Sequence, residues 1–200
     1  DASITDQTLL ATLTMSATSF GSATDANPGA LITADTITDD SSADATGTAL
    51  RKHLEDNGVG LVGTVSLPVP SGTAAIMVGE NAENMIVVAP GANAHLTLDS
   101  AHVRAVVADC DVLLLQLEIP PSTALAAARL ARDAGATVVL NASPAGTDPL
   151  ALAQLATVTD VVIVNEAEAA GWHWPVAHLV ITRGARGAVH RTADGETTVP

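Results

Sequence analysis

Residues 161–165, Val-Val-Ile-Val-Asn, limit the fold of this chain more than any other stretch. Four apolar residues in a row, most of them β-branched, are typical of a strand buried on both faces, and the polar Asn165 stands where that strand leaves the core. Two further short apolar runs also finish in a polar residue: residues 138–140 before Asn141, and residues 179–181 before Thr182. The three runs predict a parallel sheet whose carboxyl ends meet at one crevice, where ligands bind in open α/β sheets.

The segments around these strands carry the signals of helices and turns. A fourth strand is expected at residues 112–115, followed by a helix that begins near Pro121 and ends at Gly135. The apolar face expected for this helix consists of Ala126, Ala127, Leu130, Ala131 and Ala134. Further helices are expected at residues 46–57, at 100–108, from near 149 and at 166–171, and hairpins at residues 74–89 and 188–199.

Composition argues against several classes of protein. The net charge of −14, from 22 acidic and 8 basic residues, argues against nucleic-acid binding, because phosphate backbones are held by clustered Lys and Arg. No apolar run approaches the roughly 18 residues that suggest a membrane span, and no basic segment indicates a signal peptide. The single cysteine, Cys110, excludes an internal disulfide and is expected to pack in the core of a cytoplasmic protein.

Gly58, Gly60 and Gly63 match the G-x-G-x-x-G pattern of dinucleotide-binding proteins. That pattern normally follows a strand and opens a helix, whereas here it follows an expected helix and leads into extended residues. We therefore interpret these glycines as a helix end and a turn, with Gly58 in the left-handed conformation.

Six short motifs occur in one order along the chain: P-S-G-T-A at 70–74, P-G-A-N-A at 90–94, Q-L-E at 116–118, N-A-S-P-A at 141–145, N-E-A-E-A at 165–169 and I-T-R-G-A-R-G at 181–187. In this order and at these spacings, residues 46–200 resemble the ribokinases of the PfkB-type carbohydrate kinase family. The resemblance implies one α/β domain over residues 1–200, with a doubly wound, mainly parallel sheet and helices on both faces. It also implies a small β lid, to which the N-terminal region and residues 60–78 contribute.

The same resemblance implies an activity, namely transfer of the γ-phosphoryl group of ATP to the 5-hydroxyl of ribose. The implied cofactors and partners are Mg²⁺, a monovalent cation such as K⁺, ATP and ribose, with a homodimer formed through the lid. Two alternatives stay open: another sugar or nucleoside kinase of the same family, and a non-catalytic sugar-binding relative.

Six positions match residues that bind ligands in this family. Glu118 matches a carboxylate that accepts hydrogen bonds from the sugar, and its structural alternative is a solvated strand-end carboxylate. Asn165 and Glu168 match the N-x-x-E motif near the phosphates and Mg²⁺, and their alternative is a capping box in which each satisfies the other. A third group, Thr182, Gly184 and Gly187, matches the turn on which the nucleotide lies, and its alternative is an ordinary turn between strands.

Two departures from the family pattern affect the expected chemistry. Residues 1–45 contain nothing like the G-G-K-G-x-N segment that grips the sugar. The D-T-x-G-A-G-D segment, which provides the general base and an anion hole, is expected beyond Pro200. The chain is thus expected to be part of a sugar kinase, and these 200 residues alone are expected to be inactive, because phosphoryl transfer relies on such groups.

Overall fold

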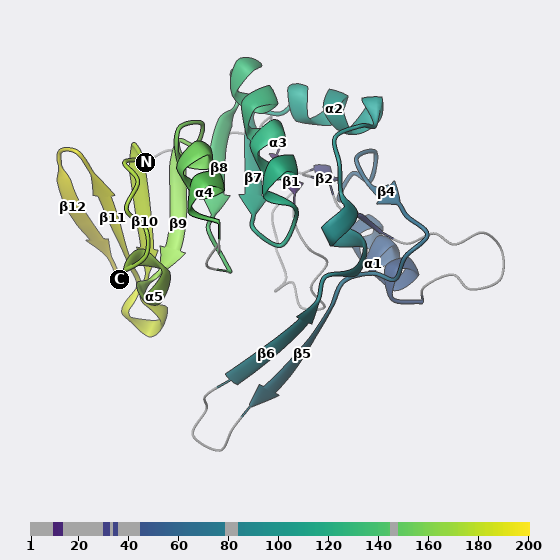
Figure 1. The fold of residues 1–200 in the computed structure, drawn as a ribbon, viewed down its shortest axis with the longest axis horizontal. Helices are drawn as coiled ribbons and strands as arrows, with labels where there is room; N and C mark the ends of the chain where they lie inside the picture. Colours follow the sequence, from purple (N-terminus) through teal and green to yellow (C-terminus); the bar gives the residue numbers. More distant parts are fainter. Residues whose placement is uncertain (1–9, 14–29, 33, 36–44, 79–83, 145–147) are drawn as a thin grey trace.

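The computed structural model describes residues 10–13, 30–32, 34–35, 45–78, 84–144 and 148–200. The strands of its main sheet are β1 (Leu10–Leu13), β2 (Ala30–Ile32), β7 (Val112–Gln116), β8 (Thr137–Asn141), β9 (Val161–Asn165), β10 (His178–Thr182), β11 (Ala188–Thr192) and β12 (Gly195–Val199). Within the described residues they form an eight-stranded sheet in the order β12-β11-β10-β9-β8-β7-β1-β2 (Figure 1). The strands from β10 to β2 run parallel, and β11 and β12 continue the sheet as antiparallel strands.

The four strands predicted from apolar runs, β7 to β10, are adjacent and parallel, which confirms the expected α/β class. Every second residue of these strands points into a core where it is almost completely buried. Those core residues are Leu113, Leu115, Val138, Leu140, Val162, Val164, Leu179 and Ile181. The opposite face of the same strands is half-buried or exposed, and it carries apolar and polar residues in equal number.

Three helices, α2 (Ala101–Ala108), α3 (Pro121–Asp133) and α4 (Pro149–Ala156), lie together on one side of the sheet (Figure 1). The face that α3 buries differs from the expected one, because Ala126 and Ala134 are exposed. The buried residues are Thr123, Ala124, Ala127, Ala128 and Ala131. Alanines occur on several sides of this helix, so the apolar pattern does not single out one face. None of the described helices is long and apolar enough to cross a membrane.

A short connection joins β9 to β10. It contains the four-residue helix α5 (Glu166–Ala169), and an irregular segment follows up to β10. Trp172 from this segment packs against the core, its ring contacts that of Trp174 edge-on at 5.2 Å between centroids, and its Nε1 donates to the Trp174 carbonyl oxygen at 2.9 Å. Trp172, held by Trp174, thus helps to cover the core where a crossover helix usually lies.

The expected hairpin at residues 74–89 is confirmed as a two-stranded antiparallel ribbon of β5 (Thr73–Val78) and β6 (Asn84–Ala89). Most of its expected turn, residues 79–83, lies outside the described residues. Figure 1 shows the ribbon projecting away from the main sheet on the side of the carboxyl ends of its parallel strands. The 3₁₀ helix η1 (Gly91–His95) leads from the ribbon back to the body of the protein.

The first part of the chain forms α1 (Ala45–Asp56) and a small parallel pair, β3 (Ala34–Asp35) with β4 (Val65–Ser66). Gly58 has φ 74°, and Val59 N donates to the Leu54 carbonyl oxygen at 2.9 Å. This geometry confirms that Gly58 ends the helix in the left-handed conformation.

The order of strands reverses next to β1. From β1 the chain continues to β2 on one side, and it returns later to β7 on the other side. Such a switch point leaves a crevice at the carboxyl ends of the strands, because the connections leave in opposite directions. The segment that follows β7 contains Glu118.

Candidate active site

The polar residues that were expected at one edge of the sheet do lie there. Strand pairing sets Gln116 level with Asn141 and Asn165 level with Thr182, each at the carboxyl end of its strand. Glu118 follows two residues after β7 ends. The parallel sheet therefore brings together side chains from four separate parts of the chain.

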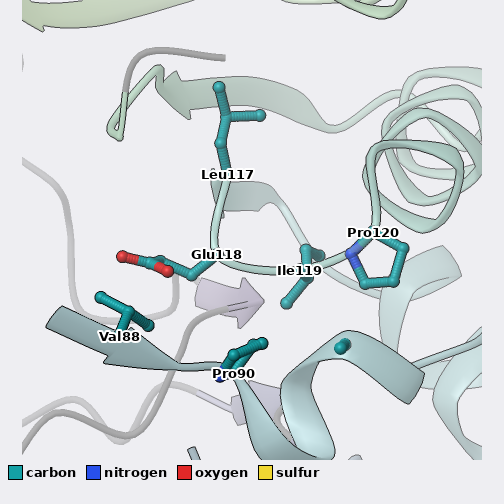
Figure 2. Close-up of a pocket in the computed structure, with 7 residues that line it drawn as sticks. Val88, Pro90, Leu117, Glu118, Ile119 and Pro120 are labelled. Atoms are coloured by element: carbon teal, nitrogen blue, oxygen red, sulfur yellow. The ribbon is translucent and has the colours of Figure 1, made fainter. Parts of the chain in front are cut away.

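A pocket of about 480 Å³ opens beside Glu118. Its lining comes from the ribbon, from η1 and from the loop between β7 and α3: Val88, Pro90, Ala94, Leu117, Glu118, Ile119 and Pro120. Figure 2 shows the Glu118 carboxylate directed toward Val88 of the ribbon. One carboxylate among apolar side chains is the usual composition of a small-molecule site, in which a few polar groups fix the orientation of the ligand.

Glu118 is half-buried, and burial raises the pKa of its carboxyl above the ordinary value. Within the part of the chain that the structure describes, no side chain or backbone group donates a hydrogen bond to this carboxylate. Its oxygens are thus available to accept hydrogen bonds from a ligand, and the partial burial distinguishes Glu118 from a fully exposed strand-end carboxylate.

The loops that enter and leave the ribbon are held together at its base. Ala92 N donates to the Pro70 carbonyl oxygen at 2.9 Å. Gly91 has φ +51°, and a Cβ there would lie 2.4 Å from the same carbonyl oxygen, so only glycine fits this crossing. The Thr123 hydroxyl donates to the Leu96 carbonyl oxygen at 2.6 Å, which ties the end of η1 to the start of α3. The ribbon and the Glu118 segment are therefore joined through buried contacts.

Asn165 and Glu168 form the capping box that was considered as their structural alternative. Glu168 N donates to Asn165 Oδ1 at 2.8 Å, and Asn165 N donates to Glu168 Oε2 at 2.8 Å. Glu168 Oε1 has no hydrogen-bond donor among the described residues. The capping interaction thus occupies one oxygen of the carboxylate and leaves the other accessible.

The turn from Thr182 to Gly187 contains the 3₁₀ helix η2 (Gly184–Arg186). The Thr182 hydroxyl donates to the Val164 carbonyl oxygen at 3.3 Å. Gly184 has φ +57°, and the space beside it is open, whereas a Cβ on Gly187 would lie 2.0 Å from the Val199 carbonyl oxygen. Glycine at 187 is therefore explained by the approach of β12, and glycine at 184 by its left-handed backbone conformation.

An ion-pair cluster that the sequence did not reveal links this turn to α5. Arg186 Nη2 lies 2.5 Å from Glu166 Oε2, and Arg183 Nε lies 3.8 Å from Glu166 Oε1. The chain has only 8 basic residues, so two of them in one turn at this edge are a local concentration of positive charge. Spacing alone could not indicate the pairing, because it joins residues on two different strand ends.

The described residues contain no group of three or more His, Cys, Asp or Glu side chains that could hold a metal ion. Mg²⁺, however, keeps several waters and is commonly held by one or two carboxylates together with substrate phosphates. The half-buried Glu168, with its accessible Oε1, fits such a site.

An open, mainly parallel sheet with its pocket at a strand-order reversal defines a ligand-binding protein of the doubly wound α/β class. The model of the pfkB family carbohydrate kinases matches residues 43–200. The chain belongs to this family.

The relatives found by sequence are ribokinases. The chain is 35% identical over 130 residues to the ribokinase of Haemophilus influenzae, which covers 64% of this chain and 41% of that protein. It is 33% identical over 132 residues to the ribokinase of Dictyostelium discoideum, again covering 64% of this chain and 41% of that protein. The chain therefore spans less than half the length of these relatives.

Solved structures share the fold. The ribokinase of Arabidopsis thaliana complexed with ribose and ATP matches with a TM-score of 0.74 at 19% identity, covering 96% of this chain and 77% of that chain. A Burkholderia thailandensis nucleoside kinase in complex with inosine matches with a TM-score of 0.70 at 18% identity, covering 87% of this chain and 58% of that chain. At these identities the likeness concerns the fold, which is confirmed as ribokinase-like.

Proposed function

We propose that this chain is part of an ATP-dependent sugar kinase that transfers the γ-phosphoryl group of ATP to the 5-hydroxyl of ribose, giving ribose 5-phosphate and ADP. The observation that carries the proposal is the half-buried Glu118 carboxylate, which lies in a pocket at the strand-order reversal with its oxygens free to accept hydrogen bonds. Membership of the carbohydrate kinase family supports phosphoryl transfer as the reaction class.

At the sugar end, Glu118 accepts hydrogen bonds from ribose hydroxyls. The apolar side chains of Val88, Pro90 and Ile119 cover the less polar face of the sugar, and the ribbon acts as a lid. In this proposal the lid consists of β5 and β6, and β5 overlaps the expected residues 60–78. Exclusion of water by a lid limits hydrolysis of ATP in place of transfer to the sugar.

At the nucleotide end, the turn at Thr182, Gly184 and Gly187 supports ATP, and Asn165 lies beside the phosphates. Glu168 would hold Mg²⁺ through water or directly, and the metal would supply positive charge beside the phosphates. In the transfer, the bond from the sugar 5-oxygen to the γ-phosphorus forms as the bond to the ADP oxygen breaks. The 5-hydroxyl proton passes to a general base that the resemblance places beyond Pro200. A monovalent cation such as K⁺ belongs to the same proposal, with none of the described residues assigned to it.

The protein is further proposed to be a cytoplasmic homodimer that associates through the ribbon. Ile86 and Val87 are neighbours on β6, so they point to opposite faces of the ribbon, yet they are 53% and 56% exposed. A ribbon that covers a sugar with one face would leave the other available to a second copy.

A nucleoside kinase is the second candidate. It is favoured by the pocket volume of about 480 Å³ and the largely apolar lining, which could accommodate a base as well as a pentose. A coupled ADP-release assay on the protein as it is encoded, with ribose, inosine and adenosine as acceptors, separates the two. The proposal predicts the highest kcat/KM with ribose; a higher value with a nucleoside favours the second candidate. Sugar binding in calorimetry without ADP release would instead indicate a non-catalytic relative.

A further inference from the structure

Asn93 is completely buried, and among the described residues neither its side-chain oxygen nor its side-chain nitrogen has a hydrogen-bond partner. Two other buried polar residues are paired: the Thr123 hydroxyl donates to the Leu96 carbonyl oxygen at 2.6 Å, and the Thr159 hydroxyl donates to the Leu155 carbonyl oxygen at 2.9 Å. A buried amide without partners costs stability, and buried polar groups in native proteins are nearly always satisfied. The arrangement around Asn93 therefore needs an explanation.

The unpaired amide lies at the base of the ribbon, between the two loops that hold it. A Cβ added to Gly72 would lie 2.4 Å from Asn93 Nδ2 and 2.9 Å from the Pro90 carbonyl oxygen. Gly72 precedes β5 and Asn93 follows β6. The Asn93 amide therefore bridges the loop that enters the ribbon and the loop that leaves it. Any change in the tilt of the ribbon alters the distance between these two loops.

The same residue is close to the pocket. Pro90 and Ala94, on either side of Asn93 in η1, both line it. The backbone of Asn93 is itself well fixed, because its N–H donates to the Pro90 carbonyl oxygen at 3.1 Å and its carbonyl oxygen accepts from Leu96 N at 3.3 Å. Leu96 is in turn bound by Thr123 at the start of α3, the helix that follows the Glu118 loop. A change at the Asn93 side chain can thus reach the sugar pocket through few contacts.

We propose that Asn93 is a positioning residue for the sugar site, whose amide becomes hydrogen-bonded to the backbone of residues 70–72 when the ribbon settles onto a bound sugar. In the arrangement described here the amide is unpaired, and in the second arrangement it is paired. The new hydrogen bonds lower the free energy of the second arrangement relative to the first. A sugar that stabilises the second arrangement therefore binds more tightly when the Asn93 amide is present than when it is removed. The inference rests on the proposed function, since it takes the Glu118 pocket as the sugar site.

Substitution of Asn93 is expected to affect protein stability and sugar binding in an unusual combination. Replacing Asn93 by the similarly sized, apolar Leu removes an unpaired buried amide, which is neutral or stabilising for the protein without sugar, yet it removes the hydrogen bonds that help the sugar to bind. If Asn93 had an ordinary structural role, the protein would lose stability when the amide is removed. Stability and sugar affinity are therefore expected to respond differently.

The experiment compares the wild-type protein, as it is encoded, with Asn93→Leu and Asn93→Ala. Thermal unfolding is measured without sugar for the wild type and Asn93→Leu, and ribose binding is measured by calorimetry for all three. We expect the Tm of Asn93→Leu to equal or exceed that of the wild type, and ribose affinity to fall about tenfold in both variants, with ATP affinity unchanged. The alanine variant adds no atoms beside Gly72, so it provides the ribose comparison if the leucine variant does not fold.

Thr159→Val is the matched control, because Thr159 is a buried polar residue whose hydroxyl is paired and lies before β9, at the opposite edge of the sheet. It should lower Tm and leave ribose affinity unchanged. A fall in Tm for a folded Asn93→Leu as large as that for Thr159→Val would overturn the inference, as would unchanged ribose affinity in the Asn93 variants. If the wild-type protein itself binds no ribose, the proposed function fails. If the wild type binds ribose and the Asn93 variants bind it equally well, only the inference about Asn93 fails.

Discussion

Asn165 and Glu168 hydrogen-bond to each other in both directions across the first turn of α5, each at 2.8 Å from backbone nitrogen to side-chain oxygen. The pair therefore fixes the segment that follows β9 whether or not a ligand is bound. The resemblance assigns the same pair to the phosphates and Mg²⁺. The two roles are compatible, because the cap uses Glu168 Oε2 and leaves Oε1 accessible.

Glu168→Gln separates these roles. Glutamine also serves at the third position of a capping box, so stability should change by no more than about 0.5 kcal/mol. The loss of charge should lower turnover and raise the Mg²⁺ concentration needed for half-maximal activity. A magnesium titration of the kinase activity measures this, with Glu196→Gln, level with the amino-terminal end of β10, as the matched control. Unchanged magnesium dependence in Glu168→Gln would favour a purely structural cap.

Arg186→Leu should weaken ATP binding. Arg186 pairs with Glu166 at 2.5 Å beside the proposed nucleotide turn, and the acidic chain has few other cations to meet a phosphate. Because exposed charge contacts contribute up to about 1 kcal/mol, we expect KM for ATP to rise about fivefold and KM for ribose to stay constant. The control is Arg191→Leu, which removes a comparable pair with Glu196, 2.6 Å apart, level with the amino-terminal end of β10 rather than with its carboxyl end. Equal effects of the two substitutions would contradict a specific role for Arg186.

Glu118→Gln should alter the pH dependence of stability. Burial raises the pKa of Glu118 in the folded protein, so the folded state keeps this proton to higher pH than the unfolded chain does. The stability that follows from this is present at low pH and is lost as pH rises from about 4.3, the ordinary value for Glu, through the raised folded pKa. The variant should therefore match or exceed the wild-type Tm at pH 7.5, and the difference should vanish toward about pH 4.

Thermal unfolding across this pH range is the measurement, and the same change at the exposed Glu55 controls for the loss of a negative charge. A Glu118→Gln variant that is less stable than the wild type, increasingly so as pH rises, would show that the carboxylate is paired in the folded protein.

Asp160→Ala tests the packing of the sheet at its amino edge. Asp160 Oδ2 accepts from Val138 N at 2.8 Å, and Oδ1 accepts from Arg132 at 3.2 Å, so this one side chain ties the starts of β8 and β9 to α3. Leaving the Val138 N–H without its partner should cost about 1–3 kcal/mol in the free energy of unfolding, measured with denaturant. Asp56→Ala, which removes an exposed partner of Lys52, should change little. A similar result for the two variants would contradict the role of Asp160.

The sequence was sufficient to predict the strands β7 to β10, because each is a short apolar run that a polar residue ends. Their parallel order could also be predicted, because a helical pattern lies between each of these strands and the next. The strands β1 and β2 were not predicted, because residues 10–13 and 30–32 lie in a Thr- and Ala-rich region without clear periodicity, and their place in the sheet depends on pairing with the distant β7. In α3 the abundance of alanine hid which face is buried.

For the candidate site, the sequence predicted the residues that lie directly at strand ends, because parallel strands bring those positions to one edge. It did not indicate that Val88 and Pro90 line the pocket, since that depends on where the ribbon projects. The pairing of Glu166 with Arg186 and the buried, unpaired amide of Asn93 likewise arise from contacts between distant segments. Gly187 had a predicted ligand-binding role, and the structure adds a second reason for glycine there, the approach of Val199.

The decisive measurement is steady-state kinetics of ribose-dependent ADP release by the protein as it is encoded, compared with its Glu118→Ala variant. Hydrogen bonds to a charged group contribute about 1.5–3 kcal/mol, so removing this acceptor should raise KM for ribose about tenfold or more, while KM for ATP should stay nearly constant because Glu118 touches no phosphate. Ribose-dependent turnover in the wild type with this selective loss in the variant is the predicted result. Absence of ribose-dependent turnover, or equal weakening of both substrates, would contradict the assignment of the Glu118 pocket as the sugar site of a kinase.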